Sequence, residues 1–200
     1  MSVILLLLRL PILVVHILVG LFTILFFPKE PKNFKNSHYR IMMLWMNIIS
    51  RILGIKVDIR GVPDQSANLF VSNHVTYLDI IIINKLLPVN FIAKEEISSW
   101  PVIGRLASKT GTLFIKRGDN VESSKMIYEM EERFKLQNKI VFFPEGKIGN
   151  GKRVRKFHYK LFKSIENKEL YIQPIAIRYP SGYPINNNYS EIISCLLYTS

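Results

Sequence analysis

The stretch LFVSNHVTYLDIIIINKLLPVNFIA, residues 69–93, indicates the fold class of this chain. It begins and ends with short apolar runs, Leu69–Ser72 and Asn90–Ala93, whose hydrophobicity is continuous rather than alternating. Such runs are typical of strands that are buried on both faces of a sheet. The residues between them, Tyr77–Leu87, follow a helical pattern. A strand, a helix and a second strand in this order predict an α/β fold with parallel strands.

The same alternation continues on both sides and predicts one α/β domain over residues 56–200. We expect a mainly parallel central sheet flanked by helices, with functional residues on loops at the carboxyl ends of strands. The ending SCLLYTS does not resemble a continuation of this domain. We therefore expect an incomplete C-terminus and give residues 194–200 no role. The other strands expected are Lys56–Arg60, Thr112–Lys116, Lys139–Phe143 and Ile172–Arg178, and the other helices are Pro101–Lys109, Val121–Gln137 and Lys156–Asn167.

The composition indicates a membrane-associated protein. Among 200 residues, 27 Lys and Arg oppose 15 Asp and Glu, which gives a formal net charge of +12, while 48% of the residues are hydrophobic. This apolar content excludes a disordered chain, and the single cysteine, Cys195, excludes an internal disulfide framework. A basic chain with a mean hydropathy of +0.17 is expected to face phospholipid, a phosphorylated substrate or nucleic acid.

Residues 1–28 are expected to form a hydrophobic membrane anchor. Residues 3–28 read VILLLLRLPILVVHILVGLFTILFFP, in which one Arg and one His interrupt an apolar stretch long enough for a spanning helix. Pro11 and Gly20 leave open an interfacial insertion into one leaflet instead. A signal peptide is the other alternative, but the apolar stretch is longer than the usual signal core and no small-residue cleavage site precedes Pro28.

Residues 29–55 are expected to form a basic linker and an amphipathic helix. Several Lys and Arg residues follow the anchor, so the positive-inside rule places this side, with the α/β domain, in the cytoplasm. Over residues 39–55 the apolar positions recur at spacings of three and four. Such a helix either faces the core or lies in the headgroup region, and the neighbouring anchor makes the membrane surface the arrangement that we expect.

The loop after Leu69–Ser72 holds a possible acid–base pair. His74 is followed five residues later by Asp79. On an ideal helix these side chains would point about 140° apart, so they meet only if His74 lies in the loop and Asp79 in the first helical turn. The carboxylate would then orient the imidazole and stabilise the imidazolium. The plainer alternative is a capping Asp beside a surface His, and Asn73 or Thr76 could also cap this helix.

Two later loops carry residues suited to anion recognition. Arg117 follows the fourth expected strand, and a guanidinium can bind phosphate or carboxylate through two hydrogen bonds. Glu145 and Gly146 follow Lys139–Phe143, and glycine permits a ligand to approach closely. Arg117 could equally be a solvated strand-end charge. A basic run follows, either as a solvated face or as a rim near phosphate headgroups: Lys147, Lys152, Arg153, Arg155, Lys156, Lys160 and Lys163.

The sequence carries no metal-binding or covalent-nucleophile motif. Its four histidines are scattered, without the spacing of metal ligands. It also lacks a nucleophile elbow and a Walker loop. We therefore expect no metal ion, and direct transfer without a covalent enzyme intermediate.

Four sequence blocks occur in order: Asn73-His74-x-x-x-x-Asp79, Gly111-x-x-Phe114-Ile115-x-Arg117, Phe143-Pro144-Glu145-Gly146 and Gln173-Pro174-Ile175-Ala176-Ile177. Together they resemble the glycerolipid acyltransferase family, whose best-known members are 1-acyl-sn-glycerol-3-phosphate acyltransferases. The resemblance implies an α/β acyltransferase domain at the membrane surface, without a bound cofactor. The donor would be an acyl thioester of coenzyme A or acyl carrier protein, and the acceptor a lysophospholipid, first of all 1-acyl-sn-glycerol-3-phosphate, which would give phosphatidic acid.

The resemblance also implies a role for each site residue. His74 would be the general base that removes a proton from the acceptor hydroxyl, and Asp79 would orient it. Arg117 would hold the acceptor phosphate, while Glu145 and Gly146 would position the region around the glycerol. The expected substrate-binding residues are Asn73, Arg117, Glu145 and Gly146.

Two departures from the family pattern lie on the acceptor side. Family members usually have Thr after Glu-Gly in the third block, where this chain has Lys147-Ile148. Relatives with a longer third block often have Leu-Pro before Phe, where this chain has Arg155-Lys156 before Phe157. These differences leave lyso-ornithine lipid or another lysolipid as an alternative acceptor.

Two other classes of function compete with acyl transfer. A non-catalytic lipid- or nucleic-acid-binding membrane protein would fit the charge, but no DNA- or RNA-binding signature accompanies it, so we expect no nucleic-acid partner. A thioesterase or hydrolase would use the same pair with water in place of the acceptor.

Overall fold

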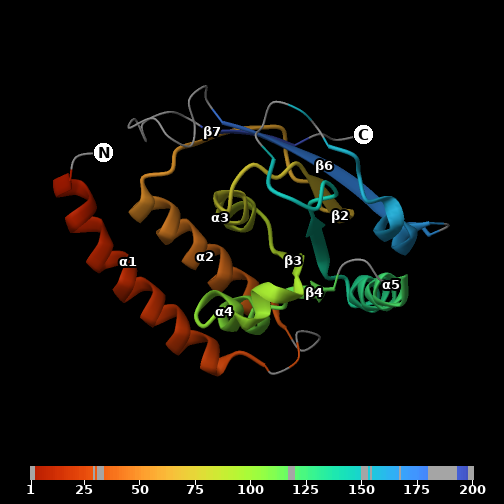
Figure 1. Ribbon diagram of the computed structural model, residues 1–200, viewed down its shortest axis with the longest axis horizontal. Helices are drawn as coiled ribbons and strands as arrows, with labels where there is room; N and C mark the ends of the chain where they lie inside the picture. The colour runs from red at the N-terminus through yellow and green to blue at the C-terminus, as the bar shows by residue number, and fades with distance from the viewer. Residues whose placement is uncertain are drawn as a thin grey trace.

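A seven-stranded sheet with helices on both faces forms the body of the molecule (Figure 1). The computed structural model describes residues 3–28, 30, 34–116, 120–149, 153, 155–166, 168–179 and 193–197. Within them the strand order is β1-β7-β6-β2-β5-β3-β4. The strands are β1 (Val57–Arg60), β2 (Ala67–Ser72), β3 (Val89–Lys94), β4 (Leu113–Ile115), β5 (Lys139–Phe142), β6 (Tyr171–Arg178) and β7 (Ile193–Leu197).

The sheet is mainly parallel, as the alternation of strands and helices predicted. Five neighbouring strands, from β6 through β2, β5 and β3 to β4, run parallel to one another. Strand β7 lies antiparallel to β6 and parallel to β1. The carboxyl ends of β2 and β5 therefore lie side by side at one edge, with Val71 of β2 opposite Phe142 of β5.

The expectation that residues 194–200 have no role was wrong for the part of them that the structure describes. Strand β7 lies between β1 and β6 and pairs with both, with Ser194 opposite Arg178 and Leu197 opposite Ile175. Its backbone hydrogen bonds thus join β1 to the rest of the sheet. Residues 198–200 lie outside the described residues.

The helices largely follow the expected positions, with one difference of type. The segment expected as a helix over Lys156–Asn167 forms the shorter 3-10 helix η4, and the 3-10 helix η3 was not expected. The helices are α1 (Val3–Thr23), α2 (Asn36–Leu53), α3 (Leu78–Leu86), α4 (Ile103–Lys109) and α5 (Asn120–Lys135), with 3-10 turns η1 (Ile24–Phe26), η3 (Glu95–Ser99) and η4 (Tyr159–Ile165).

The sheet separates two hydrophobic cores, which explains why its strands have continuous apolar runs. Phe70 of β2 is fully buried in a cluster that includes Ile82 and Ile83 of α3. Its neighbour Leu69 points to the other face and packs with Met130 of α5. Because successive side chains of a strand point to opposite faces, a strand covered on both sides must be apolar throughout.

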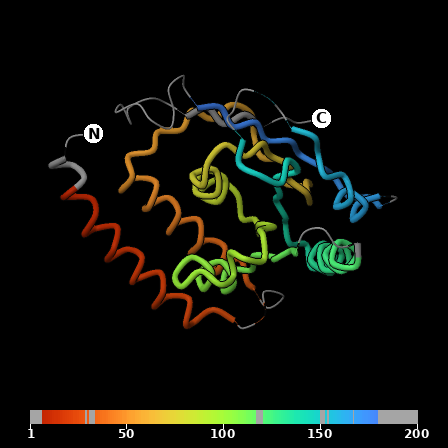
Figure 2. Tube along the Cα trace, viewed as in Figure 1, coloured from red at the N-terminus to blue at the C-terminus, as the bar shows by residue number. Residues whose placement is uncertain are grey.

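Helices α1 and α2 form an antiparallel pair beside the domain (Figures 1 and 2). The ring of His16 in α1 stacks on Trp45 of α2, with ring centroids 4.9 Å apart. Nε2 of His16 lies 3.0 Å from the carbonyl oxygen of Trp45, and Nε1 of Trp45 donates to the carbonyl oxygen of His16 at 3.3 Å. Gly20 lies so close to Trp45 that an added Cβ would come within 2.7 Å of the indole.

Helix α2 has both a core side and an exposed apolar side. Met42 and Ile49 are buried, whereas Ile41 and Leu44 are exposed. One side of α2 therefore faces the core, as one of the two alternatives predicted. Contact of its exposed side with a membrane stays a prediction. Most of α1 is exposed, and the window Leu7–Phe26 is the candidate membrane span among the described helices. The boundaries predicted at residues 28 and 55 also stay predictions.

Candidate active site

The candidate active site lies where β2 and β5 end. The loop after β2 carries Asn73 and His74 and leads into α3, whose second residue is Asp79. The loop after β5 carries Phe143, Pro144 and Glu145. Because β2 and β5 are adjacent parallel strands, both loops leave the same edge of the sheet.

His74 and Asp79 form a hydrogen-bonded pair. Nδ1 of His74 lies 2.8 Å from Oδ2 of Asp79, as expected for a histidine in the loop and an aspartate in the first helical turn. The Asp79 side chain is fully buried, while that of His74 is 13% exposed. A carboxylate accepts hydrogen bonds, so the neutral imidazole carries its hydrogen on Nδ1 and leaves the lone pair of Nε2 free to accept a proton.

The backbone of the loop holds the Asp79 carboxylate in place. Oδ2 also accepts the N–H groups of Val75 at 2.6 Å and Thr76 at 3.0 Å. Thr76 Oγ1 accepts the N–H of Leu78, the first residue of α3, at 2.9 Å. Thr76 thus accepts a backbone N–H at the start of α3, although the N-cap residue itself is Tyr77, which makes no side-chain cap hydrogen bond. Three donors on one oxygen satisfy a carboxylate that is out of contact with solvent.

Asn73 joins the loop to β6. Its side-chain nitrogen donates to the carbonyl oxygen of Ile177 at 2.9 Å, and its side-chain oxygen accepts the N–H of Ile177 at 2.7 Å. This two-point contact extends the pairing of β2 with β6 by one residue. It gives Asn73 a positioning role, and its assignment to substrate binding stays a prediction.

The loop after β5 forms one wall around His74. The ring of Phe143 stacks on the imidazole, with ring centroids 3.9 Å apart and an interplanar angle of 13°. Farther along this loop, the N–H of Gly149 donates to the carbonyl oxygen of His74 at 2.7 Å. The Phe143 ring thus packs on the face of the imidazole, and the Gly149 hydrogen bond fixes the backbone that carries it.

Glu145 and Gly146 lie in this same wall. Glu145 is buried, and its Oε2 accepts the N–H of Arg155 at 3.0 Å. Gly146 adopts a positive φ of 68°, and its N–H donates to the carbonyl oxygen of Phe143 at 2.9 Å. A left-handed residue in a tight turn explains the glycine. The binding roles of both residues stay predictions.

Arg117, the residue expected to hold the acceptor phosphate, lies outside the described residues, as does Lys152. The adjoining strand β4 is described, and Ile115 of β4 pairs with Lys94 of β3. The remaining basic residues of the run beyond Glu145 are exposed on the surface: Lys147, Arg153, Arg155, Lys156, Lys160 and Lys163.

Sequence reasoning missed two side chains of this site. Phe143 is part of the third block, but nothing in the pattern predicts that its ring stacks on His74. Tyr179 follows β6 and donates its hydroxyl hydrogen to Oδ1 of Asp79, and it lies 3.1 Å from Oγ1 of Thr76. Tyr179 and Asp79 are 100 residues apart, so only the tertiary fold brings them together.

Within the described residues, no group of three or more His, Cys, Asp or Glu could hold a metal ion.

Comparison with known proteins identifies the family of this chain and agrees with its α/β fold. Residues 55–178 match the family model described as Acyltransferase, and the chain belongs to this acyltransferase family. The resemblance inferred from the four blocks is therefore confirmed. A crystal structure of the 1-acyl-sn-glycerophosphate (LPA) acyltransferase PlsC from Thermotoga maritima shares the fold, with a TM-score of 0.71 and 17% identity over 98% of this chain and 83% of that one.

Relatives with two activity names are similar in sequence. The chain is 34% identical over 140 residues to the lyso-ornithine lipid O-acyltransferase of Pseudomonas aeruginosa, covering 70% of this chain and 54% of that protein. It is 32% identical over 128 residues to the 1-acyl-sn-glycerol-3-phosphate acyltransferase of Neisseria gonorrhoeae, covering 64% and 50%. The chain thus spans about half the length of the curated relatives it matches.

Proposed function

We propose that the protein transfers an acyl chain from an acyl thioester to the free hydroxyl of a lysolipid at a membrane surface. The observation that carries this proposal is the hydrogen bond between His74 and the buried carboxylate of Asp79 at the carboxyl edge of the sheet. In a member of the acyltransferase family, this pair supplies the base that such a transfer needs.

The proposed reaction is a direct transfer. Nε2 of His74 takes the proton of the acceptor hydroxyl as its oxygen attacks the thioester carbonyl carbon. The imidazolium then faces Asp79, whose negative charge stabilises it. As the tetrahedral intermediate collapses, the carbon–sulfur bond breaks and His74 returns the proton to the leaving thiolate. The donor would be acyl-CoA or acyl-acyl carrier protein, and the chain itself supplies no cofactor.

Exposed aromatic side chains support the presence of an acyl chain beside His74. The ring of Tyr77 lies 6.5 Å from the His74 ring, and Trp100 lies 6.2 Å from Tyr77. Tyr77 is 57% exposed and Trp100 43%, so a hydrocarbon chain can reach both rings. The proposed partner is the hydrocarbon chain of the donor or the acceptor.

The expected acceptor is 1-acyl-sn-glycerol-3-phosphate, with its phosphate on Arg117 and its glycerol near Glu145 and Gly146. A second candidate is lyso-ornithine lipid. It is favoured by the replacement of the usual Thr by Lys147 and by the name of the Pseudomonas aeruginosa relative. The two acceptors differ in the charge of the headgroup, so a direct comparison of turnover separates them.

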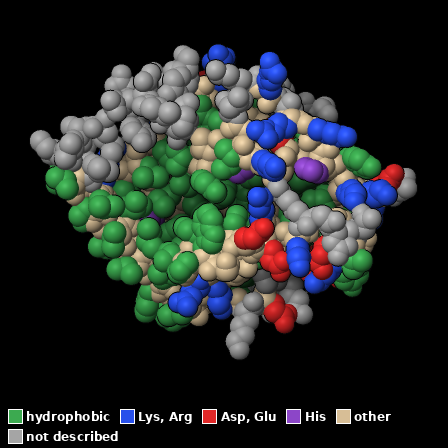
Figure 3. All heavy atoms as spheres, viewed as in Figure 1, with side chains coloured by type: hydrophobic (Ala, Val, Ile, Leu, Met, Phe, Trp, Pro, Cys, Tyr) green, Lys and Arg blue, Asp and Glu red, His purple; other side chains and the backbone are tan. Residues whose placement is uncertain are grey.

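The proposed site of action is the membrane surface, with the catalytic domain on its cytoplasmic side. Figure 3 shows hydrophobic side chains over much of the left and lower part of one face, and Lys and Arg side chains gathered toward its upper right. The apolar part includes exposed residues of α1 such as Leu18 and Phe22. Apolar burial would hold the protein at the bilayer, and the net charge of +12 would favour anionic lipid.

The test is an assay of purified protein in vesicles with a panel of lysolipid acceptors and both thioester donors. We expect acylated product from at least one acceptor, and loss of product in His74→Ala with vesicle binding unchanged. Release of free fatty acid without acylated lipid would instead indicate a thioesterase. No turnover with any acceptor, together with lipid binding, would indicate a binding protein.

A further inference from the structure

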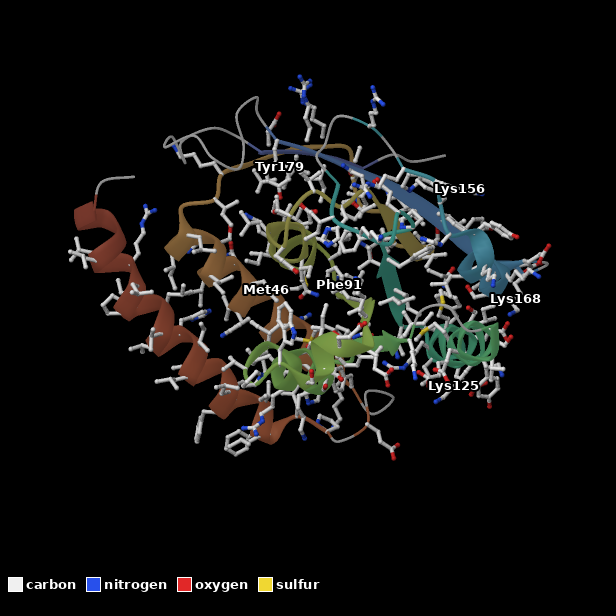
Figure 4. All side chains as sticks on the ribbon, viewed as in Figure 1. Met46, Phe91, Lys125, Lys156, Lys168 and Tyr179 are labelled. Atoms are coloured by element: carbon white, nitrogen blue, oxygen red, sulfur yellow. The ribbon has the colours of Figure 1, made fainter. Side chains whose placement is uncertain are left out.

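We infer that Tyr179 is a positioning residue for the proposed acyl transfer, because its hydroxyl fixes the orientation of the carboxylate that holds His74. This inference rests on the proposed function and adds a residue to it. Tyr179 follows β6 and lies near α3 (Figure 4). It belongs to neither of the two loops that carry His74 and Glu145.

The two carboxylate oxygens of Asp79 have different partners. Oδ2 faces the loop, where it accepts Nδ1–H of His74 and the backbone N–H groups of Val75 and Thr76. Oδ1 accepts the hydroxyl hydrogen of Tyr179. A donor on Oδ1 opposes rotation of the carboxylate about its Cβ–Cγ bond, and rotation would take Oδ2 away from the imidazole.

The hydrogen bonds around Tyr179 run in one direction. The N–H of Leu78 donates to Oγ1 of Thr76 at 2.9 Å. Because the Tyr179 hydroxyl gives its hydrogen to Asp79, it must accept the hydrogen of Thr76 Oγ1, which lies 3.1 Å away. The network therefore leads from the start of α3 through Thr76 and Tyr179 to Asp79.

This network also moderates the charge that faces His74. Each donor to a carboxylate stabilises its negative charge, so removal of one leaves a carboxylate that favours the imidazolium more strongly. Among the described residues, Tyr77 in the same loop has its ring 6.5 Å from that of His74, and Tyr179 after β6 hydrogen-bonds to Asp79. Of these, Tyr179 directly contacts the carboxylate. Loss of its hydroxyl should thus change both the geometry and the proton affinity of the pair.

The test compares Tyr179→Phe with Tyr171→Phe. Tyr171 starts the same strand, is exposed, and lies at the opposite end of β6 from the site, so its variant controls for loss of a tyrosine hydroxyl. With acyl-CoA and the best lysolipid acceptor, Tyr179→Phe should lower kcat about tenfold, which corresponds to about 1.4 kcal/mol in the barrier, and leave the KM for the acceptor within about twofold. Tyr171→Phe should match the wild type.

A second readout does not depend on turnover. In ¹⁵N-histidine-labelled protein in detergent micelles, the His74 ring resonances, assigned by their loss in His74→Ala, should change position in Tyr179→Phe and stay at the wild-type position in Tyr171→Phe. Unchanged kcat and unchanged His74 resonances in Tyr179→Phe would overturn the inference. A wild-type protein that acylates no lysolipid would overturn the proposed function instead, while the NMR comparison would still test the contact of Tyr179 with the pair.

Discussion

Two histidines of this chain have similar surroundings and different partners. His16 stacks on Trp45 and His74 stacks on Phe143, and both rings hydrogen-bond to an oxygen. The partner of His16 is a neutral carbonyl oxygen of α2, whereas that of His74 is the buried carboxylate of Asp79. A carbonyl can accept a hydrogen bond, but a carboxylate can also stabilise an imidazolium.

The two histidines therefore differ in role: His16 joins two helices, whereas His74 is the proposed base. His16 lies between two helices and is 9% exposed, so its hydrogen bond satisfies a polar ring in an apolar helix pair. His74 lies at the edge of the sheet, where strands β2 and β5 end, and its Nε2 is free to accept a proton. Position at a strand end and an ionised partner, rather than burial or stacking, distinguish the proposed base.

The largest effect is expected from removal of the proposed base. His74→Ala should lower kcat for acyl transfer about 1,000-fold, because general base catalysis contributes about 10²–10⁴-fold. The matched variant His16→Ala should keep kcat within about threefold of wild type and lose about 1 kcal/mol of stability, the typical value of one hydrogen bond. Steady-state kinetics and thermal unfolding of both variants would check this contrast, and equal kinetic losses in the two would contradict it.

A smaller effect is expected from the contact between α1 and α2. Gly20→Leu should destabilise the helix pair by about 1–3 kcal/mol, because its side chain would overlap the Trp45 indole. Val19 is exposed on the same helix, so Val19→Leu serves as the control and should be neutral. Thermal unfolding followed by tryptophan fluorescence would measure both. A Gly20→Leu protein as stable as the control would show that the two helices do not need this close approach.

The smallest effect concerns the pH dependence of stability where α2 meets the sheet. The hydroxyl of Tyr39 lies 3.0 Å from the side-chain oxygens of Asn90 and Asn138. Burial raises the pKa of Tyr39 above its ordinary value of 10.0, although Arg133 and the hydrogen bond to Asn90 oppose this. A raised folded-state pKa means that the stability due to the neutral phenol is complete below pH 10 and is lost as the pH rises through the folded value.

Tyr39→Phe should therefore flatten the fall of the unfolding temperature above pH 10. Tyr128→Phe removes an exposed hydroxyl and should keep the wild-type slope. Unfolding temperatures from pH 8 to 11 would provide the comparison. A slope unchanged by Tyr39→Phe would mean that Tyr39 does not link α2 to the sheet through its neutral hydroxyl.

Local patterns were sufficient to predict much of the fold and the central pair. The continuous apolar runs predicted β2 and β3, because both strands contribute side chains to the cores on the two faces of the sheet. His74 and Asp79 are only five residues apart, so the sequence could offer their contact as a hypothesis that depends on where α3 begins, and the structure has them in contact.

Contacts between distant segments could not be predicted in the same way. The position of β7 between β1 and β6 depends on which strands pair, and the run ISCLL does not encode a partner. The two hydrogen bonds between Asn73 and Ile177 join residues 104 positions apart, and the hydrogen bond of Tyr179 to Asp79 joins residues 100 positions apart. Such contacts exist only after the strands have assembled in their order, and they are the ones that position the site.

The most direct test of the central claim, that His74 and Asp79 act as one catalytic unit, is a double-mutant cycle. The acyl-transfer kcat would be measured for His74→Ala, Asp79→Asn and the protein that carries both changes. Because Asp79 is proposed to act through the imidazole, the double variant should be no slower than His74→Ala alone. Losses that multiply in the double variant would show that the two residues act independently and would contradict the account.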